Sequence, residues 1–234
     1  MAKIVWLVSY PRSGNTWLRF LLSNVQHPDK RIGYSEVDIF APDIYRSSDA
    51  HKFSYGWSPV FVKSHDQWRE EYDKVIYLYR DVRDVLVSCF FYEIWKQSSV
   101  KDESELMFAD FFERFVVGDV EFGSWKEHIE FWLCKKVDKF MLSYEEIEAD
   151  AENALLRIFD FAEINAGRSE AKRAAEKSKY SKLMERGYIE EIHPYKIGVR
   201  GCSGGWSGFL NQDQKERIWE WAGGTLRKLG YNAE

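Results

Sequence analysis

The chain has 234 residues, of which 45% are hydrophobic and 30% are charged, values that exclude a disordered protein. Its formal net charge of −5 disfavours a protein that binds a nucleic acid polymer, because such proteins carry an excess of basic residues. Cys89, Cys134 and Cys202 are too widely spaced for a metal-binding pair or a disulfide framework, and no apolar run has the length of a signal peptide or a membrane span. We therefore expect a soluble, cytoplasmic protein.

Short apolar runs alternate with amphipathic segments along the chain. Four runs are typical of buried parallel strands, namely 4–8, 60–62, 75–79 and 140–143. Apolar residues at helical spacing and capping residues predict helices at 14–25, 81–92, 106–117, 125–133, 145–161 and 212–229. Residues 171–182 are expected to form a polar helix or a helical turn. Strands separated by helices form parallel sheets covered by helices, so we predict an α/β fold with a central parallel sheet in a single domain, 1–234.

Capping residues and loops complete this outline. Ser13 stands where the N-cap of the first helix belongs, and Asp81 stands at the start of the third-strand helix with Asp84 three residues later, as in a capping box. Residues 28–59 and 96–105 are polar or proline-containing and break the alternation, so we expect loops there that bind the acceptor substrate or cover the site.

Basic residues follow three of the four predicted strands. Arg12 comes after the first strand, Lys63 after the second, and Arg80 and Arg83 after the third. In a parallel α/β sheet, ligands bind beyond the carboxyl ends of the strands, next to helix N-termini. This clustering of cations in a net-acidic chain predicts an anionic ligand, although Arg83 falls inside the first helical turn and suits a surface or ion-pair role better.

The turn after the first strand is similar to a phosphate-binding loop but lacks its lysine. The nucleotide triphosphatase version requires Gly-x-x-x-x-Gly-Lys-Ser/Thr. Here Asn15 stands at the lysine position and Ser9 at the first glycine, and the cation has moved to Arg12. Backbone N–H groups at the helix start can still bind an anion, but the missing lysine disfavours chemistry driven by ATP or GTP.

Five motifs occur in the order of one enzyme family. Residues 10–17, Tyr-Pro-Arg-Ser-Gly-Asn-Thr-Trp, resemble the 5′-phosphosulfate loop of the sulfotransferases that use 3′-phosphoadenylyl sulfate (PAPS). Residues 79–88 resemble their 3′-phosphate motif, and residues 63–65 their Lys-x-His. Residues 144–146 are similar to their Tyr-Glu-Asp, and residues 199–206 to their glycine-rich C-terminal block. Cytosolic-type sulfotransferases are the nearest likeness.

The resemblance implies a P-loop-like α/β enzyme that transfers the sulfuryl group of PAPS to a hydroxyl or amine of a small-molecule acceptor. The transfer is in line, needs no metal and leaves adenosine 3′,5′-bisphosphate (PAP). His65 is implied as the general base, with Lys63 and Arg12 stabilising developing charge. The residues implied to bind the donor are Arg12, Ser13, Gly14, Asn15, Thr16, Trp17, Arg80, Ser88, Tyr144, Ser178, Tyr180, Arg200 and Gly201.

Two departures from the family pattern bear on the donor site. Arg12 stands where cytosolic members carry lysine, which keeps the charge but replaces a point ammonium by a planar fork. In the last block Val199 replaces a basic residue and Gly205 an acidic one, which leaves Arg200 as the basic residue of that block.

Other functions and roles stay open at the level of sequence. A P-loop-type nucleotide or small-molecule kinase shares the fold, and a non-catalytic phosphoadenosine-binding module would retain Arg80 and Ser88. Individual residues also suit purely structural roles: Trp17 suits core packing, and Arg80 suits an ion pair with Asp81 or Asp84. Neither the acceptor nor the oligomeric state is indicated.

Overall fold

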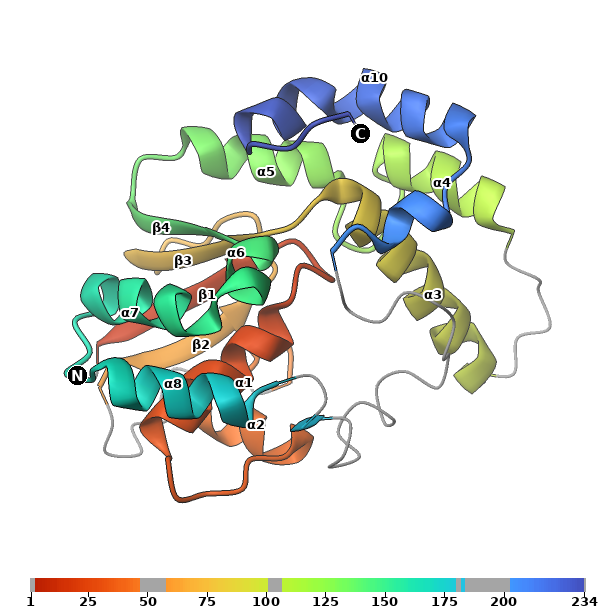
Figure 1. Ribbon diagram of the computed structural model, residues 1–234. Helices are drawn as coiled ribbons and strands as arrows, with labels where there is room; N and C mark the ends of the chain where they lie inside the picture. The colour runs from red at the N-terminus through yellow and green to blue at the C-terminus, as the bar shows by residue number, and fades with distance from the viewer. Residues whose placement is uncertain (1–2, 47–57, 101–106, 180–181, 184–202, 234) are drawn as a thin grey trace. The chain divides into compact units, whose positions relative to one another are not determined.

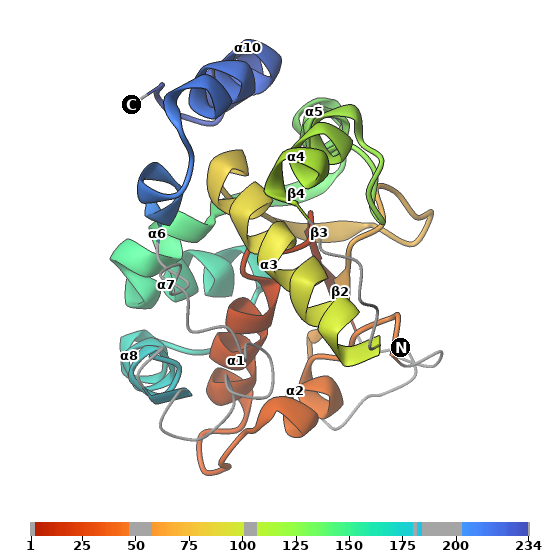
Figure 2. The same ribbon diagram turned by 90° about the vertical axis from the view of Figure 1, so that its right-hand side faces the viewer.

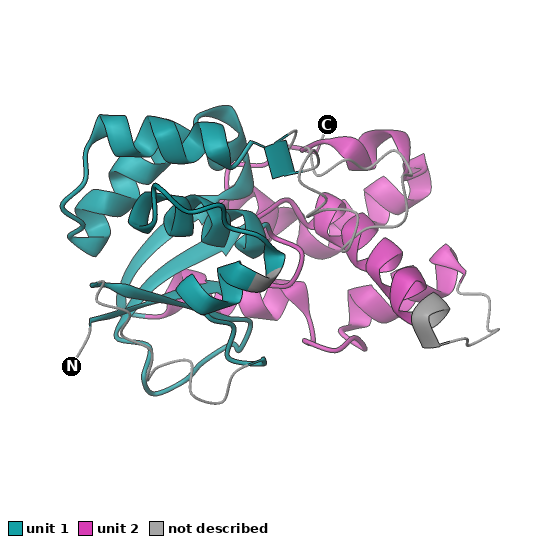
Figure 3. Cartoon of the chain, turned by 90° about the horizontal axis from the view of Figure 1, so that it is seen from below, with its two compact units in different colours: residues 1–9, 14–79, 136–192 teal, residues 10–13, 80–135, 193–234 magenta. Residues whose placement is uncertain are grey.

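In the computed structural model, residues 3–46, 58–100, 107–179, 182–183 and 203–233 are described. They fall into two compact units, shown in different colours in Figure 3. The sheet unit consists of residues 1–9, 14–79 and 136–192, and the helical unit of residues 10–13, 80–135 and 193–234. The single-domain organisation stays a prediction, and each unit is described by itself.

The sheet unit is built on four parallel strands in the order β2-β1-β3-β4. They are β1 (Ile4–Ser9), β2 (Val60–Ser64), β3 (Lys74–Tyr79) and β4 (Asp138–Ser143), each within two residues of its predicted bounds. The interiors of β1, β2 and β3 are buried on both faces, which explains why these strands are apolar at nearly every position. The predicted parallel sheet is confirmed.

Helices of the sheet unit cover this sheet (Figure 1). They are α1 (Asn15–Gln26), α2 (Tyr34–Phe40), α6 (Tyr144–Ala149), α7 (Ala151–Ala162) and α8 (Arg168–Lys177). α1 packs against β1, β2 and α8, and α7 against β4 and α8. The shared core takes aliphatic and aromatic side chains from the strands and from α1 and α7, among them Val5, Leu7, Phe61, Ile76, Leu78, Leu142, Leu18, Leu22, Leu155 and Phe159.

The helical unit contains α3 (Val82–Val100), α4 (Phe108–Val117), α5 (Trp125–Cys134), the 3-10 turn η2 (Gly205–Gly208) and α10 (Gln212–Lys228). α3 packs against α4, η2 and α10, and α10 also packs against α5 (Figure 2). Phe111, Phe115, Trp125 and Trp132 are buried here, which accounts for part of the 17% aromatic content. Within the described residues, no helix has the length and hydropathy needed to cross a membrane.

Several local expectations differ from the structure. α3 ends at Val100 rather than near residue 92, so residues 96–100 of the loop expected at 96–105 are helical. The N-cap of α1 is Gly14 rather than Ser13, because the turn holds Gly14 in a left-handed conformation with φ 97°. The segment predicted as one helix at 145–161 is two helices, since the Asp150 carboxylate accepts from the Asn153 N–H and starts α7 afresh. α2 and η2 lie in segments where no helix is expected from the sequence.

Candidate active site

The turn between β1 and α1 has the backbone of an anion-binding loop. Arg12 and Gly14, on either side of Ser13, have φ 66° and 97°. Left-handed residues in the turn before a helix can direct successive N–H groups to one point, and such concavities bind anions. Gly14 is also required sterically, because a Cβ there would lie 2.4 Å from Cδ2 of Tyr144. As glycine, it offers no side-chain oxygen to the first N–H groups of α1.

A buried hydroxyl in this turn fits an anionic ligand. Ser13 is fully buried, and its Oγ has no hydrogen-bond partner among the described residues. Buried hydroxyls are normally satisfied, so an orphan beside converging N–H groups indicates a position that a ligand oxygen completes. Thr16 follows in the first turn of α1. Both Ser13 and Thr16 belong to the sequence motif at residues 10–17.

Arg12, Arg80 and Ser88 meet within the helical unit, although they come from two separate motifs. The Arg12 Nε donates to Ser88 Oγ at 3.0 Å, and the Arg80 Nη1 donates to the Arg12 carbonyl oxygen at 3.4 Å. The Arg12 guanidinium also lies 5.1 Å from the centre of the Tyr92 ring. The structure therefore brings together three of the residues expected to bind one donor, and adds Tyr92, which the sequence does not indicate.

Asp84 links Arg80 to the glycine-rich block inside the same unit. Its carboxylate lies 4.0 Å from Arg80 Nη2 and accepts from the N–H groups of Gly204 at 2.8 Å and Trp206 at 3.2 Å. Burial raises the pKa of Asp84, while Arg80 and the two N–H groups oppose that rise. The capping-box pattern at 81–84 therefore does not predict the long-range contact of Asp84 with the glycine-rich block, because that contact depends on tertiary structure.

Arg83 has a structural role, as its position in the helix suggests. Its guanidinium pairs with the Asp81 carboxylate at 2.6 Å and lies 3.8 Å from the centre of the Trp206 ring. It also donates to the carbonyl oxygens of Asn232 and Ala233. Because Arg83 is buried rather than exposed, it fixes the C-terminal segment to α3.

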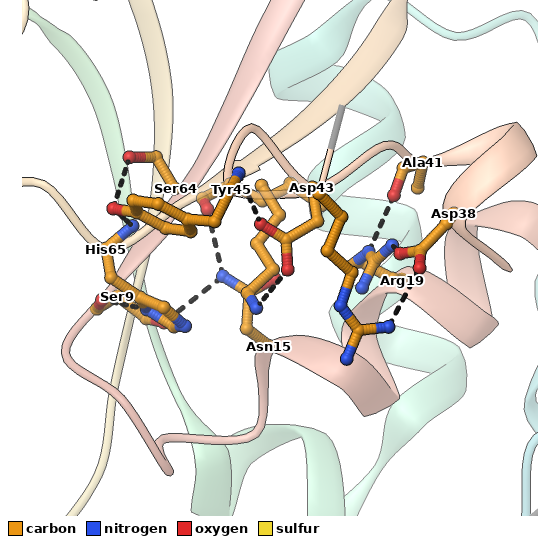
Figure 4. A network of polar contacts seen from close by, with 12 residues as sticks. Ser9, Asn15, Arg19, Asp38, Ala41, Asp43, Tyr45, Ser64 and His65 are labelled. Atoms are coloured by element: carbon orange, nitrogen blue, oxygen red, sulfur yellow. Dashed lines mark hydrogen bonds and ion pairs between the residues drawn. The ribbon is translucent and has the colours of Figure 1, made fainter. Parts of the chain in front are cut away.

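In the sheet unit, His65 is held against the end of β1 (Figure 4). Its Nδ1 lies 2.7 Å from the Ser9 carbonyl oxygen. A carbonyl oxygen only accepts, so Nδ1 carries the proton and Nε2 is the basic nitrogen of the neutral ring. On the other side, the Tyr45 hydroxyl accepts from the His65 backbone N–H at 2.9 Å, and the two rings are nearly parallel at 6.0 Å.

Lys63 forms an ion pair with a residue that the sequence does not indicate. Its Nζ lies 2.6 Å from Asp43 Oδ2, and both side chains are largely buried. Backbone hydrogen bonds place Asp43 beside Lys63, since Lys63 N–H donates to Pro42 and Ile44 N–H donates to Lys63. Burial lowers the pKa of Lys63, and the Asp43 carboxylate opposes this. Nothing in the 28–59 segment marks Asp43 as the partner.

A second ion pair, between buried Arg19 and half-buried Asp38, lies nearby in the same network (Figure 4). The Arg19 guanidinium pairs with Asp38 and donates to the Ala41 carbonyl oxygen. Arg46 pairs with the other oxygen of Asp38 at 2.9 Å. The segment from α2 to Arg46 is thus tied to α1 and β2 by charge pairs.

The sheet unit also brings together Trp17, Tyr144 and Ser178. The ring centres of Trp17 and Tyr144 are 5.4 Å apart, and Trp17 Nε1 donates to the Ser178 carbonyl oxygen at 2.8 Å. The Ser178 hydroxyl is fully buried and accepts from Asn24 Nδ2 at 3.0 Å. Ser178 is therefore placed to hold Trp17, and Asn24 is a supporting residue that sequence reasoning missed. Tyr180, Arg200 and Gly201 lie outside the described residues.

The described part of the chain contains no group of three or more His, Cys, Asp or Glu side chains arranged to hold a metal ion. The parallel sheet and the turn after β1 together define a P-loop-like α/β protein.

The family model described as the sulfotransferase domain matches residues 3–230. The chain therefore belongs to the sulfotransferase family and is a transferase. Mouse sulfotransferase 2A6 is 26% identical over 238 residues, covering 90% of this chain and 79% of the relative. Rabbit amine sulfotransferase is 26% identical over 243 residues, covering 92% and 77%, and human sulfotransferase 2A1 is 30% identical over 168 residues, covering 67% and 58%.

Solved structures share the fold. A mouse sulfotransferase, SULT7A1, complexed with PAP has a TM-score of 0.68 at 24% identity, covering 96% of this chain and 84% of that one. Retinol dehydratase in complex with androsterone and the inactive cofactor PAP has a TM-score of 0.71 at 22% identity, covering 95% and 80%. The expected fold class and family are confirmed, and the kinase alternative loses its support.

Proposed function

We propose that this sulfotransferase moves the sulfuryl group of PAPS to a hydroxyl or amine of a small-molecule acceptor. The observation that carries the donor assignment is the meeting of Arg12, Arg80 and Ser88: the Arg12 guanidinium donates to the Ser88 hydroxyl, and the Arg80 guanidinium donates to the Arg12 backbone. Two arginines held at neighbouring positions suit a highly charged anion. The rabbit relative named amine sulfotransferase supports the breadth of the acceptor class.

Each part of the donor has proposed partners. Arg12, the Ser13 hydroxyl and the N–H groups from Gly14 to Thr16 bind the 5′-phosphosulfate, while Arg80 and Ser88 bind the 3′-phosphate. Trp17 and Tyr144 contact the adenine, and Ser178 acts by holding Trp17 through its carbonyl oxygen. Tyr180, Arg200 and Gly201 remain proposed donor contacts on the family resemblance alone.

The proposed reaction is a single in-line displacement at sulfur. Nε2 of His65 takes the proton of the acceptor hydroxyl or amine as that acceptor atom bonds to sulfur. The bond from sulfur to the 5′-phosphate oxygen breaks, and its electron pair stays on that oxygen in PAP. Arg12 and Lys63 stabilise the negative charge that develops on the sulfonate and the leaving oxygen, and the proposal requires no metal.

The state of Lys63 shapes its part in this proposal. Its Nζ is paired with the Asp43 carboxylate, so we propose that Lys63 acts on the developing charge together with this compensating group. We also propose a cytoplasmic location, because Cys89 and Cys134 are free thiols, as is usual in a reducing compartment.

A transfer assay with radiolabelled PAPS tests this function. It uses phenols, aliphatic alcohols and amines as acceptors, with EDTA present, and compares the wild type with His65→Asn. Asparagine retains a side-chain N–H for Ser9 but has no basic nitrogen, so we expect turnover to fall about 100-fold or more while PAP still binds. His27→Ala, which changes a histidine at the end of α1, is the matched control.

Two results contradict the proposal. Wild-type turnover in His65→Asn removes His65 as the base. Phosphoryl transfer from ATP with Mg²⁺, in place of sulfuryl transfer from PAPS, removes the function itself.

A further inference from the structure

We infer that Ser9, whose hydroxyl accepts a hydrogen bond from Asn15, is the positioning residue that orients His65 and sets its tautomer. This inference deepens the proposed function and rests on His65 being the base. All three residues belong to the sheet unit, and Figure 4 shows them side by side. Neither Ser9 nor Asn15 carries a charge, so their effect must come through hydrogen-bond geometry.

Ser9 presents two acceptor oxygens to one nitrogen of His65. The carbonyl oxygen lies 2.7 Å from Nδ1, and Oγ lies 3.3 Å from the same atom. Ser9 is the last residue of β1, fully buried, and paired with Leu78 of β3, so the sheet fixes its backbone. The Nδ1–H bond is therefore shared between a rigid carbonyl oxygen and a hydroxyl whose position depends on its own partners.

Asn15 holds this hydroxyl in place. Its Nδ2 donates to Ser9 Oγ at 3.1 Å and to the Leu7 carbonyl oxygen at 2.9 Å. The opposite orientation of the amide would bring its oxygen against the Leu7 oxygen, so the orientation of Asn15 is fixed. The residue at the position of the phosphate lysine thus turns toward β1 and the base, and contributes to the donor through its backbone N–H.

The amide is retained here despite a local cost. Asn15 is buried, and its Oδ1 has no hydrogen-bond partner among the described residues. An unsatisfied buried acceptor destabilises a fold, so packing alone would favour an apolar residue. The two donated bonds explain its presence, because they connect the loop that binds the donor to the oxygen beside the base.

These contacts give the His65 ring one preferred tautomer and one preferred orientation. Two acceptors at Nδ1 stabilise the tautomer whose Nε2 is unprotonated, which is the form that can accept a proton. Without Ser9 Oγ, the ring keeps one acceptor and gains rotational freedom. We expect fewer molecules in the competent tautomer and orientation, and hence a lower kcat with unchanged donor affinity.

The experiment compares Ser9→Ala with Ser9→Thr, which keeps a hydroxyl, and with Ser23→Ala as matched control. Ser23 is a buried serine of α1 whose Oγ has no partner within the described residues. We expect Ser9→Ala to lower kcat about tenfold, the effect of one hydrogen bond, with PAP affinity changed less than about twofold. Ser9→Thr restores kcat, and Ser23→Ala leaves it unchanged. Should Ser9→Ala fail to fold, Ser9→Cys, a weak acceptor of similar size, takes its place.

Nitrogen-15 NMR of the His65 ring supplies a readout that a merely structural role would not move. The wild type should show the tautomer protonated at Nδ1, and Ser9→Ala should shift the population toward protonation at Nε2. Wild-type kcat and tautomer in Ser9→Ala would overturn the inference, as would a loss of PAP binding equal to the loss of kcat.

A double-mutant cycle separates this inference from the proposed function. In the His65→Asn background, removing Ser9 Oγ should cost no further turnover, because the base it positions is absent. If His65→Asn itself retains wild-type turnover, the base assignment fails, while the tautomer measurement still decides whether Ser9 sets the state of the ring.

Discussion

Arg12 is the residue whose backbone conformation supports the proposed donor site most directly. A left-handed conformation, with φ 66°, is unfavourable for a residue that carries a Cβ. Such strain costs about 1 kcal/mol or more and persists where the surroundings impose it, commonly at binding sites. Here the Arg12 guanidinium donates to Ser88 while the neighbouring Ser13 hydroxyl is left unsatisfied, and both observations support the anion site proposed for this turn.

The Lys63–Asp43 ion pair gives a prediction about the stability of the fold. Removing one partner of a buried pair leaves an uncompensated charge, so we expect Asp43→Ala to lower the free energy of unfolding by about 3 kcal/mol. The double variant Asp43→Ala with Lys63→Met should be more stable than Asp43→Ala alone, because no buried charge remains. Urea unfolding measures both. If the free energy of unfolding lost in the double variant equals the sum of the losses in the two single variants, the two side chains do not depend on each other.

Among the helices, α6 shows how a local pattern and a distant contact combine. Ser143 and Glu146 form a capping box at its start, and Arg157 of α7 pairs with the same carboxylate. The Ser143–Glu146 spacing is visible in the sequence, whereas the Arg157 contact depends on how α7 packs after the break at Asp150. Local signals thus define where a helix begins, and tertiary packing decides which charges it meets.

A pH-dependent prediction follows for Glu146. Burial raises its pKa, but hydrogen bonds from Arg157 and from Ser143 outweigh burial and hold the pKa below its ordinary value. A folded-state pKa below the unfolded one means that the ionised group stabilises the fold above the unfolded pKa. That contribution is lost as the pH falls through the folded pKa. Glu146→Gln should therefore be less stable than the wild type at neutral pH, and the difference should vanish in acid.

Thermal unfolding across this pH range measures the effect of Glu146→Gln. Glu70→Gln, at an exposed position, is the matched control and should track the wild type throughout. A stability difference for Glu146→Gln that stays constant from neutral pH into acid would contradict the pKa argument.

Asp84 gives a prediction for η2 and the turn before it. Its carboxylate accepts from Gly204 and Trp206 N–H groups, so Asp84→Ala should speed hydrogen exchange at these two amides by about tenfold or more. Asp84→Asn keeps one acceptor oxygen and should have a smaller effect. Exchange at amides within α4 serves as the internal reference. Unchanged protection at Gly204 and Trp206 would show that other contacts hold this segment.

Over the whole molecule, sequence reasoning succeeds where the signal is local. All four strands are found because each contains a short apolar run, which in β1, β2 and β3 is buried. The residues at the strand ends follow from that, and so does the expectation that Arg12 and Arg80 act together. The partners of Lys63 and of His65 could not be found, because Asp43 and Ser9 are separated from them by 20 and 56 positions and have no pattern of their own. α2 was missed because it is a short helix in a segment rich in proline and serine.

The stability of the whole chain supplies the final prediction, because a ligand that binds only the folded state stabilises all of it. At a PAP concentration of 100 times its dissociation constant, the free energy of unfolding should rise by about 2.7 kcal/mol. Adenosine 5′-monophosphate lacks the 3′-phosphate and should stabilise less at the same concentration. This difference between the two nucleotides isolates the 3′-phosphate site. In Arg80→Met it should largely disappear, since the guanidinium of Arg80 is the charge proposed to bind that phosphate.

Arg114→Met removes an exposed arginine of α4 and is the matched control for charge, so it should keep the full difference between the nucleotides. Thermal unfolding with each nucleotide measures all three proteins. Raising the salt concentration should reduce the difference in the wild type more than in Arg80→Met, because screening acts on the charge pair that the variant lacks. If Arg80→Met still distinguishes PAP from the monophosphate as the wild type does, Arg80 does not bind the 3′-phosphate, and the meeting of Arg12, Arg80 and Ser88 must serve another group of the donor.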